Sequence, residues 1–189
     1  MTRHARFAMV VTGLGLLGAA CLGEDVPSAP GASAADAGAG SVAGNLVQLG
    51  GFELEACGGW TKNGATAESD ATARNGSRSC RICREISPGV FGIFQVLDGV
   101  PAGNYVAEAW VRATPEAGLG STYIGLQAVD AEGAFVGDAE ETSTSFVGEW
   151  KRVTTSIVYP GGKGLAVSLT VRDGDACFLA DDVSVTKAP

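Results

Sequence analysis

Short stretches in which apolar and polar residues alternate recur along most of this chain, and helical periodicity is nearly absent. Alternation with a period of two, rich in β-branched residues, is typical of strands that bury one face. Gly, Pro, Asn and Asp separate the stretches at turns such as RNGS, VPAGN and YPGGKG. About ten strands in about 145 residues predict an all-β fold, a two-sheet antiparallel β-sandwich of the jelly-roll kind. The predicted strands are 45–55, 65–70, 77–86, 91–100, 104–113, 121–131, 140–147, 150–159, 164–173 and 177–186.

The N-terminal part of the chain lacks this pattern. Residues 1–20 have arginines, then an apolar run, then small residues before Cys21, which is the layout of a bacterial secretory signal peptide. We expect lipidation of Cys21, with ordinary cleavage after Ala20 as the alternative. Residues 21–44 are rich in Ala, Gly and Ser and predict a flexible tether, which leaves 45–189 as the folded domain. The sequence predicts export, as an outer-membrane or cell-surface lipoprotein or else as a periplasmic or secreted protein.

Charge and composition argue against several classes of function. Loss of residues 1–20 lowers the formal net charge from −8 to −10 and removes His4, the only histidine. An acidic surface argues against nucleic acid as a partner. Without histidine, Ser-His and Cys-His nucleophilic catalysis are excluded in their usual form. Acidic residues are plentiful but fall mostly in turns, where they usually remain solvated, so the chain is predicted not to be an enzyme.

Four cysteines lie within the predicted domain, at Cys57, Cys80, Cys83 and Cys177. An even number in an exported protein predicts two disulfides, and neither a thioredoxin-like unit nor a second close pair supports a redox or zinc role. Cys80 and Cys83 are three apart on a strand and point to opposite faces, about 10 Å from each other, which argues against a bond between them. We expect Cys80–Cys177 inside the sandwich and Cys57–Cys83 near its rim. The pairing that joins Cys57 to Cys80 and Cys83 to Cys177 stays open.

Six short stretches occur in a familiar order between Asn45 and Val185: NLVQLGGFE, GW, NGSRSCRI, GNYVAEAWVRA, EWKRVTTSI and FLADDVSV. Together they resemble the carbohydrate-binding modules of the CenC type, jelly rolls of galactose-binding-like fold attached to many bacterial cellulases and xylanases. The resemblance covers nearly the whole predicted domain. It implies a structural calcium ion near the start of the first strand and a glycan-binding cleft on a concave sheet.

The calcium ligands that the resemblance implies come from three parts of the chain. They are the carboxylates of Glu53 and Asp181, the carbonyl oxygen of Gly51, and carbonyl oxygens around Arg74 and Ser77. All of these are oxygen donors, which calcium prefers.

Strand parity gives Asp181 and Asp182 different expected environments. Asp181 shares parity with Leu179 and Val183, which predicts that it points inward, where a lone carboxylate is costly. A calcium ion would offset that cost and tie the two ends of the domain together. The alternative is that Asp181 only accepts backbone hydrogen bonds at a strand end. Asp182 is expected to point outward into water.

The sugar-binding residues are expected on one face of two successive strands. Trp110, Arg112 and Glu108 share the face of 104–113 that is not apolar, and Tyr123 and Gln127 on the next strand have matching parity. The resemblance implies that aromatic rings stack on sugars and that polar side chains bond to hydroxyl groups in such a cleft. The alternative for Trp110 is a place in the core.

Two functions from different classes follow. The first is a non-catalytic, monomeric module that binds a poly- or oligosaccharide and meets the membrane only through its lipid anchor. The second is a structural or adhesive surface lipoprotein domain of the same fold that binds no sugar. The absence of an obvious catalytic domain and the small number of aromatic residues favour the second, whereas the family resemblance favours the first.

Overall fold

The computed structural model describes residues 43–54, 57–85, 91–114, 121–144, 148–172 and 177–189. The chain divides into two units, Met1–Ser33 and Ala34–Pro189, and the described residues all belong to the second. The expectations for residues 1–20, for Cys21 and for nearly all of the tether lie outside the described residues. Within these residues, no helix is both long enough and apolar enough to cross a membrane.

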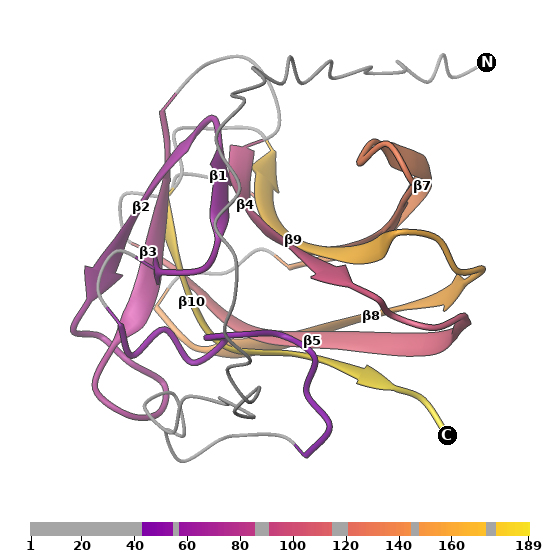
Figure 1. The fold of residues 1–189 in the computed structure, drawn as a ribbon. Coiled ribbons are helices and arrows are strands. Elements are labelled where there is room, and N and C mark those ends of the chain that lie inside the picture. The colour runs from indigo at the N-terminus through magenta and orange to yellow at the C-terminus, as the bar shows by residue number, and fades with distance from the viewer. Residues whose placement is uncertain (1–42, 55–56, 86–90, 115–120, 145–147, 173–176) are drawn as a thin grey trace, which may run out of the picture. The chain divides into compact units, whose positions relative to one another are not determined.

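Ten strands form two antiparallel sheets, which confirms the predicted β-sandwich of jelly-roll type (Figure 1). The first sheet has the order β1 (Thr61–Asn63), β4 (Phe91–Asp98), β9 (Gly164–Arg172), β6 (Ser121–Val129) and β7 (Phe135–Thr144). The second sheet has the order β2 (Ala65–Asp70), β3 (Ser79–Arg84), β10 (Cys177–Lys187), β5 (Gly103–Ala113) and β8 (Lys151–Tyr159).

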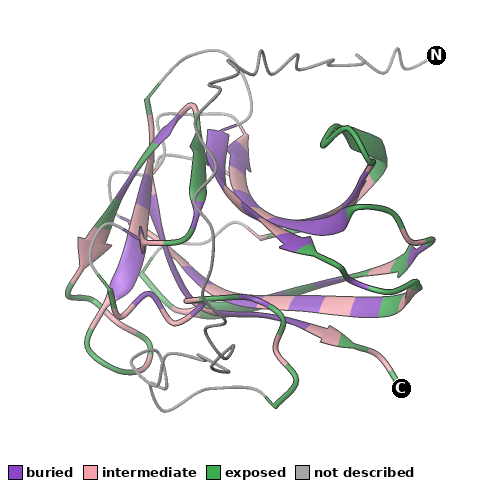
Figure 2. Ribbon diagram, viewed as in Figure 1, coloured by how far each residue is buried: buried purple, intermediate pink, exposed green. Residues whose placement is uncertain are grey.

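The core lies between the two sheets because each strand buries alternate residues. Along β5, Tyr105, Ala107, Ala109 and Val111 are at most 1 % exposed, whereas the residues between them are partly exposed, as the banding in Figure 2 shows. The inward residues of the first sheet meet them from the other side; they include Ile93, Ile124, Leu126, Leu165 and Leu169. Burial of these apolar side chains is the main stabilising contribution to the fold.

The predicted strand at 45–55 is wrong for the residues that the structure describes. Leu49 and Phe52 have left-handed φ angles of 56° and 53°, which interrupt any extended run. The segment nevertheless lies along β10, because the Leu46 amide donates to the Val185 carbonyl and the Val183 amide donates to the Gly50 carbonyl, each at 2.9 Å. The first strand in the part of the chain that the structure describes is β1, which pairs with β4 at the edge of the first sheet.

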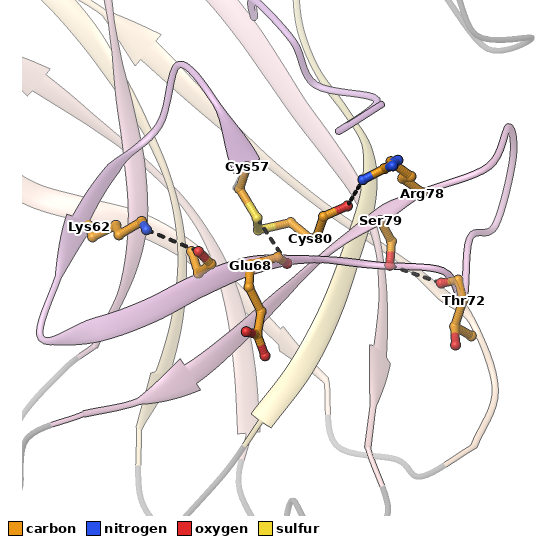
Figure 3. Close-up of a disulfide and its surroundings, with 9 residues drawn as sticks. Cys57, Lys62, Glu68, Thr72, Arg78, Ser79 and Cys80 are labelled. Carbon is orange, nitrogen blue, oxygen red and sulfur yellow. Dashed lines mark hydrogen bonds between the residues drawn. A yellow bond between two sulfur atoms is a disulfide. The ribbon is translucent and has the colours of Figure 1, made fainter. Parts of the chain in front are cut away.

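The expected disulfide pairing is also wrong: the bonds are Cys57–Cys80 and Cys83–Cys177. Cys83 and Cys177 are directly opposite in the register of β3 and β10, so their Cα atoms are only 4.1 Å apart. Cys80 lies opposite Ala180 and points into the core, where it bonds to Cys57 of the segment that precedes β1 (Figure 3). Parity correctly separated Cys80 from Cys83 but did not show which partner each one meets.

Candidate functional site

The outer face of the first sheet is the side turned away from the second sheet, and Figure 1 shows that β7 curls toward it. Tyr123 and Gln127, two of the five predicted sugar-binding residues, lie on this face, since their neighbours Thr122, Ile124 and Leu126 are buried. By register, the same face carries Phe94, Val96, Phe135, Glu141, Ser143, Ser168, Thr170 and Arg172.

An aromatic ring and a pair of charged groups meet near the middle of this face. The Arg172 guanidinium carbon lies 4.5 Å from the centroid of the Tyr123 ring, and the same guanidinium forms an ion pair with Glu141 on β7. The Gln127 side chain donates a 2.8 Å hydrogen bond to the Gly137 carbonyl. Strands β9, β6 and β7 thus all contribute to a compact aromatic and polar cluster.

Two polar atoms on β9 have no hydrogen-bond partner in the part of the chain that the structure describes. They are Thr170 Oγ1 and Arg172 Nε, and both are buried just beneath the surface of this face. Buried polar atoms nearly always have a partner, so unpaired ones call for an explanation such as a water molecule or a ligand. Thr170 is the direct cross-strand partner of Tyr123, which places both atoms beside the aromatic ring.

The other three predicted sugar-binding residues do not share this face, so the single predicted cleft is wrong. Trp110, Arg112 and Glu108 lie on β5, which belongs to the second sheet, whereas Tyr123 and Gln127 lie on β6 in the first. Matching parity along the chain does not place the two sets on one face, because β5 and β6 belong to different sheets.

On the outer face of the second sheet, two of these three side chains already have protein partners. The Arg74 guanidinium carbon lies 3.8 Å from the centroid of the Trp110 ring, and Glu108 forms an ion pair with Arg152 on β8. Arg112 has no ion-pair or hydrogen-bond partner among the described residues. Trp110 is partly exposed and is not a core residue.

The predicted direction of Asp181 is also wrong, because Leu179 and Asp181 lie opposite the outward residues Arg112 and Trp110, and a bulge separates them from the inward Val183. Asp181 lies opposite Trp110 and Ser184 opposite Glu108, so β10 has one extra residue between these pairs. Asp182 takes a left-handed φ of 48° at the bulge. Asp181 therefore points to the outer side, yet it is fully buried there.

Backbone amides surround the Asp181 carboxylate, as in the alternative interpretation of the sequence. Oδ2 accepts from the amides of Arg74 and Asn75 at 2.8 and 3.2 Å, and Oδ1 accepts from the amide of Asp182 at 2.8 Å. Burial nevertheless raises the pKa of Asp181 to about 6, since these bonds do not fully offset the loss of solvation. Asp182, expected in water, accepts instead from the side chains of Arg74 and Asn75.

The second predicted calcium carboxylate contacts the same loop. Glu53 accepts from the Ser77 hydroxyl at 2.7 Å and from the amides of Ser77 and Arg78. Burial alone would raise the pKa of Glu53, but these hydrogen bonds outweigh it and lower that pKa. A Cβ atom at Gly76 would lie 2.0 Å from Glu53 Oε1, and Gly76 has a left-handed φ of 67°, so this position requires glycine.

The donor chemistry at this place fits calcium. Glu53 and Asp181 bind opposite ends of the 74–78 loop, and Gly51 lies in the N-terminal segment that β10 holds through Gly50. Two carboxylates and nearby backbone carbonyls are hard oxygen donors. Among the described residues, no group of three or more His, Cys, Asp and Glu side chains could hold a metal ion, so a calcium ion here would depend on backbone oxygens.

Sequence reasoning missed Arg172, Glu141, Thr170, Phe94 and Phe135 on the outer face of the first sheet. The alternation in GLAVSLTVR places Ser168, Thr170 and Arg172 on one side of β9, and this signal was available in the sequence. What the sequence lacked was the neighbour of that strand, because β9 pairs with β4 and β6, which come much earlier in the chain.

The two-sheet jelly-roll sandwich is similar in fold to solved carbohydrate-binding modules of several families. The structurally similar proteins include the CBM22-1 xylan-binding domain of Paenibacillus barcinonensis Xyn10C, with a TM-score of 0.58 and 18% identity over 74% of this chain and 93% of that one. Another is TmCBM61 in complex with β-1,4-galactotriose, with a TM-score of 0.57 and 14% identity over 76% of this chain and 99% of that one.

A third similar structure belongs to a much longer protein, the enzymatically active domain of tailspike protein 4 of bacteriophage CBA120. Its TM-score is 0.61 at 17% identity, and the match covers 77% of this chain but 22% of that one. No family model and no curated protein matches this chain. At these identities the similarity establishes the fold, and function has to be argued from the residues themselves.

Proposed function

We propose that this protein is a non-catalytic carbohydrate-binding module, of the CenC type, that binds a poly- or oligosaccharide on the outer face of its first sheet. The observation that carries the proposal is the cluster of Tyr123, Arg172 and Glu141 beside the unpaired Thr170 hydroxyl on a curved sheet. The module is exported and anchored to a membrane by a lipid on Cys21. Its two disulfides are typical of exported proteins.

Sugars offer the chemistry that this cluster complements. The C–H face of a pyranose ring is apolar and packs on an aromatic ring, whereas its hydroxyl groups need planar polar partners such as guanidinium and carboxylate groups. Arg172 at present lies over the Tyr123 ring, so sugar binding requires this side chain to rotate aside. The rotation also uncovers Arg172 Nε and Thr170 Oγ1 for bonds to sugar hydroxyls.

The structurally similar proteins suggest which ligands to test first. One is described as a xylan-binding domain and another is in complex with β-1,4-galactotriose. We expect this chain to bind a glycan of the same chemical class.

Affinity electrophoresis of the full chain in gels containing xylan, β-glucan or β-1,4-galactan tests the proposal. We expect retardation by at least one polymer, and we expect Tyr123→Ala to weaken that binding about fivefold, since an aromatic contact contributes about 1 kcal/mol. Trp110→Ala, on the other sheet, serves as the aromatic control and should bind like wild type once circular dichroism shows that it is folded. If Trp110→Ala weakened binding and Tyr123→Ala did not, the site would lie on the second sheet.

Absence of retardation in every gel, for a folded protein, would instead support a structural or adhesive lipoprotein domain. The guanidinium groups of Arg74 and Arg172, which lie over the rings of Trp110 and Tyr123, are compatible with such a role. The electrophoresis therefore distinguishes the two classes of function directly.

We further propose that Glu53 and Asp181, with carbonyl oxygens of Gly51, Arg74 and Ser77, hold a structural calcium ion. An ion at this place supplies positive charge between two carboxylates and ties the N-terminal segment to β10. We expect thermal unfolding to occur several degrees higher in calcium than in EDTA, because the ion binds only the folded state. Glu53→Gln should abolish the difference, whereas Glu68→Gln, at an exposed ion pair, should keep it. Equal midpoints in calcium and EDTA for wild type would rule out the ion.

A further inference from the structure

Two phenylalanines from non-neighbouring strands meet across the outer face of the first sheet. The ring centroids of Phe94 on β4 and Phe135 on β7 are 5.5 Å apart, with the ring planes at 77°. In the order β1-β4-β9-β6-β7, two strands lie between them. We call this contact the phenylalanine bridge.

The distance that the bridge spans shows how far β7 folds over. In the register of the sheet, Phe135 is opposite Val129, and Gly164 is opposite both Val129 and Asp98. Phe135 is therefore level with Asp98, which is four residues along β4 from Phe94. In a flat sheet the two positions would be about 14 Å apart across the strands and about 13 Å along them. Rings can meet over such a span only because β7 bends over the face, as Figure 1 shows.

Two outward-pointing residues are buried near the bridge. Ala166 and Val129 point away from the main core, yet they are only 3 % and 2 % exposed. Neither belongs to the main core cluster between the sheets. Their burial shows that other residues cover this end of the outer face.

The polar half of the face lies on the other side of Phe94. Phe94 is opposite Ser168 on β9. The pair of Thr170 and Tyr123 lies two residues further along β9, and Arg172 lies two residues beyond Thr170. From Phe94 to Arg172 this half measures about 13 Å along the strands. Tyr123, Thr170 and Arg172 thus all lie on one side of the phenylalanine bridge.

We propose that the site binds the terminal residues of a neutral glycan rather than an internal stretch of the chain. This inference rests on the proposed sugar-binding function of the same face. Because β7 bends across the sheet, a ligand between β4 and β7 runs parallel to the strands, and the bridge lies in its path. The last sugar packs against Phe94 and Phe135, and the preceding sugars lie over Tyr123 and Arg172. Phe135 is 41 % exposed and so presents ring surface for this contact.

The test compares binding capacity with the number of chain ends. A β-1,4-linked xylan or galactan, whichever binds, is partly cleaved by an endo-acting hydrolase, so that its mass is unchanged while its ends multiply. Calorimetry with the full chain then gives the number of binding sites per gram. We expect the capacity to rise in proportion to the number of ends. A capacity that stays constant while binding persists would overturn the inference, whereas no binding at any chain length would overturn the proposed function itself.

Removal of the bridge provides a second and independent test. Phe135→Ala opens the closed end, so a long polymer can then pass through, and its capacity per gram should rise and lose its dependence on chain ends. Val158→Ala is the matched control, because Val158 is 79 % exposed on β8 of the second sheet. The control should bind like wild type. If folded Phe135→Ala keeps the dependence on chain ends, the bridge is not what stops the chain.

Discussion

Replacement of both Cys83 and Cys177 by alanine is expected to lower the free energy of unfolding by about 4 to 5 kcal/mol in urea titrations. The bond joins residues 94 apart in sequence, so its loss releases a long loop in the unfolded chain. In the folded state it joins facing positions of β3 and β10, and the strand pairing remains when it is removed. The effect should therefore come mainly from the unfolded state.

A peptide map without reduction supplies the control for this experiment. The wild-type protein should yield linked peptides containing Cys57 with Cys80 and Cys83 with Cys177. The double alanine variant should keep the first link and contain no free thiol in the domain. A loss of stability below about 1 kcal/mol would contradict the loop argument, and a Cys80–Cys177 link would contradict the structure.

Without calcium, the domain is expected to lose about 3 kcal/mol of stability between pH 4 and pH 6.5 because of Asp181. Its pKa is about 6 in the folded state against 3.8 in the unfolded state, so the folded state holds the proton more tightly. The favourable contribution is complete below pH 3.8 and disappears as the pH rises through 6. Urea titrations in EDTA at several pH values measure this slope.

Asp181→Asn is the matched variant, since it keeps the size of the side chain and removes its titration. Its stability should change little over the same pH interval. Saturating calcium should reverse the wild-type slope, because the ion binds the ionised carboxylate. The pKa of Glu53 is lowered in the folded state, so its contribution to stability is lost as the pH falls, at lower pH than the change due to Asp181. A wild-type slope in EDTA that survives Asp181→Asn would show that another group is responsible.

The fold was predictable because alternation survives wherever a strand buries one face. The predicted strand 104–113 matches β5 (Gly103–Ala113) to within one residue, and its alternating residues Tyr105, Ala107, Ala109 and Val111 are the buried set. The failures have local causes. Leu49 and Phe52 adopt left-handed φ angles without being glycine, and the three residues of β1 are all exposed, so neither region carries the expected pattern.

The candidate site was harder to predict because parity describes one strand at a time. Trp110 and Tyr123 both point away from the core, but nothing in their spacing shows that the chain crosses to the other sheet between them. Similarly, the bulge at Asp182 places Asp181 and Val183 on different sides of β10, although they are two residues apart in a regular pattern. Two of the three amides that donate to Asp181 belong to residues more than 100 positions away, which no local pattern can indicate.

The attachment of the N-terminal segment to β10 has a mechanical consequence. The segment runs antiparallel to β10, since Leu46 bonds to Val185 whereas Gly50 bonds to Val183. Tension between the chain ahead of Asn45 and the end of β10 therefore loads these bonds one after another, as in a zipper, instead of all at once in shear. The segment peels at low force while both sheets stay intact. Peeling next meets the hydrogen bonds of Glu53 to the 74–78 loop, and the disulfide Cys57–Cys80 is the covalent point beyond which it cannot proceed.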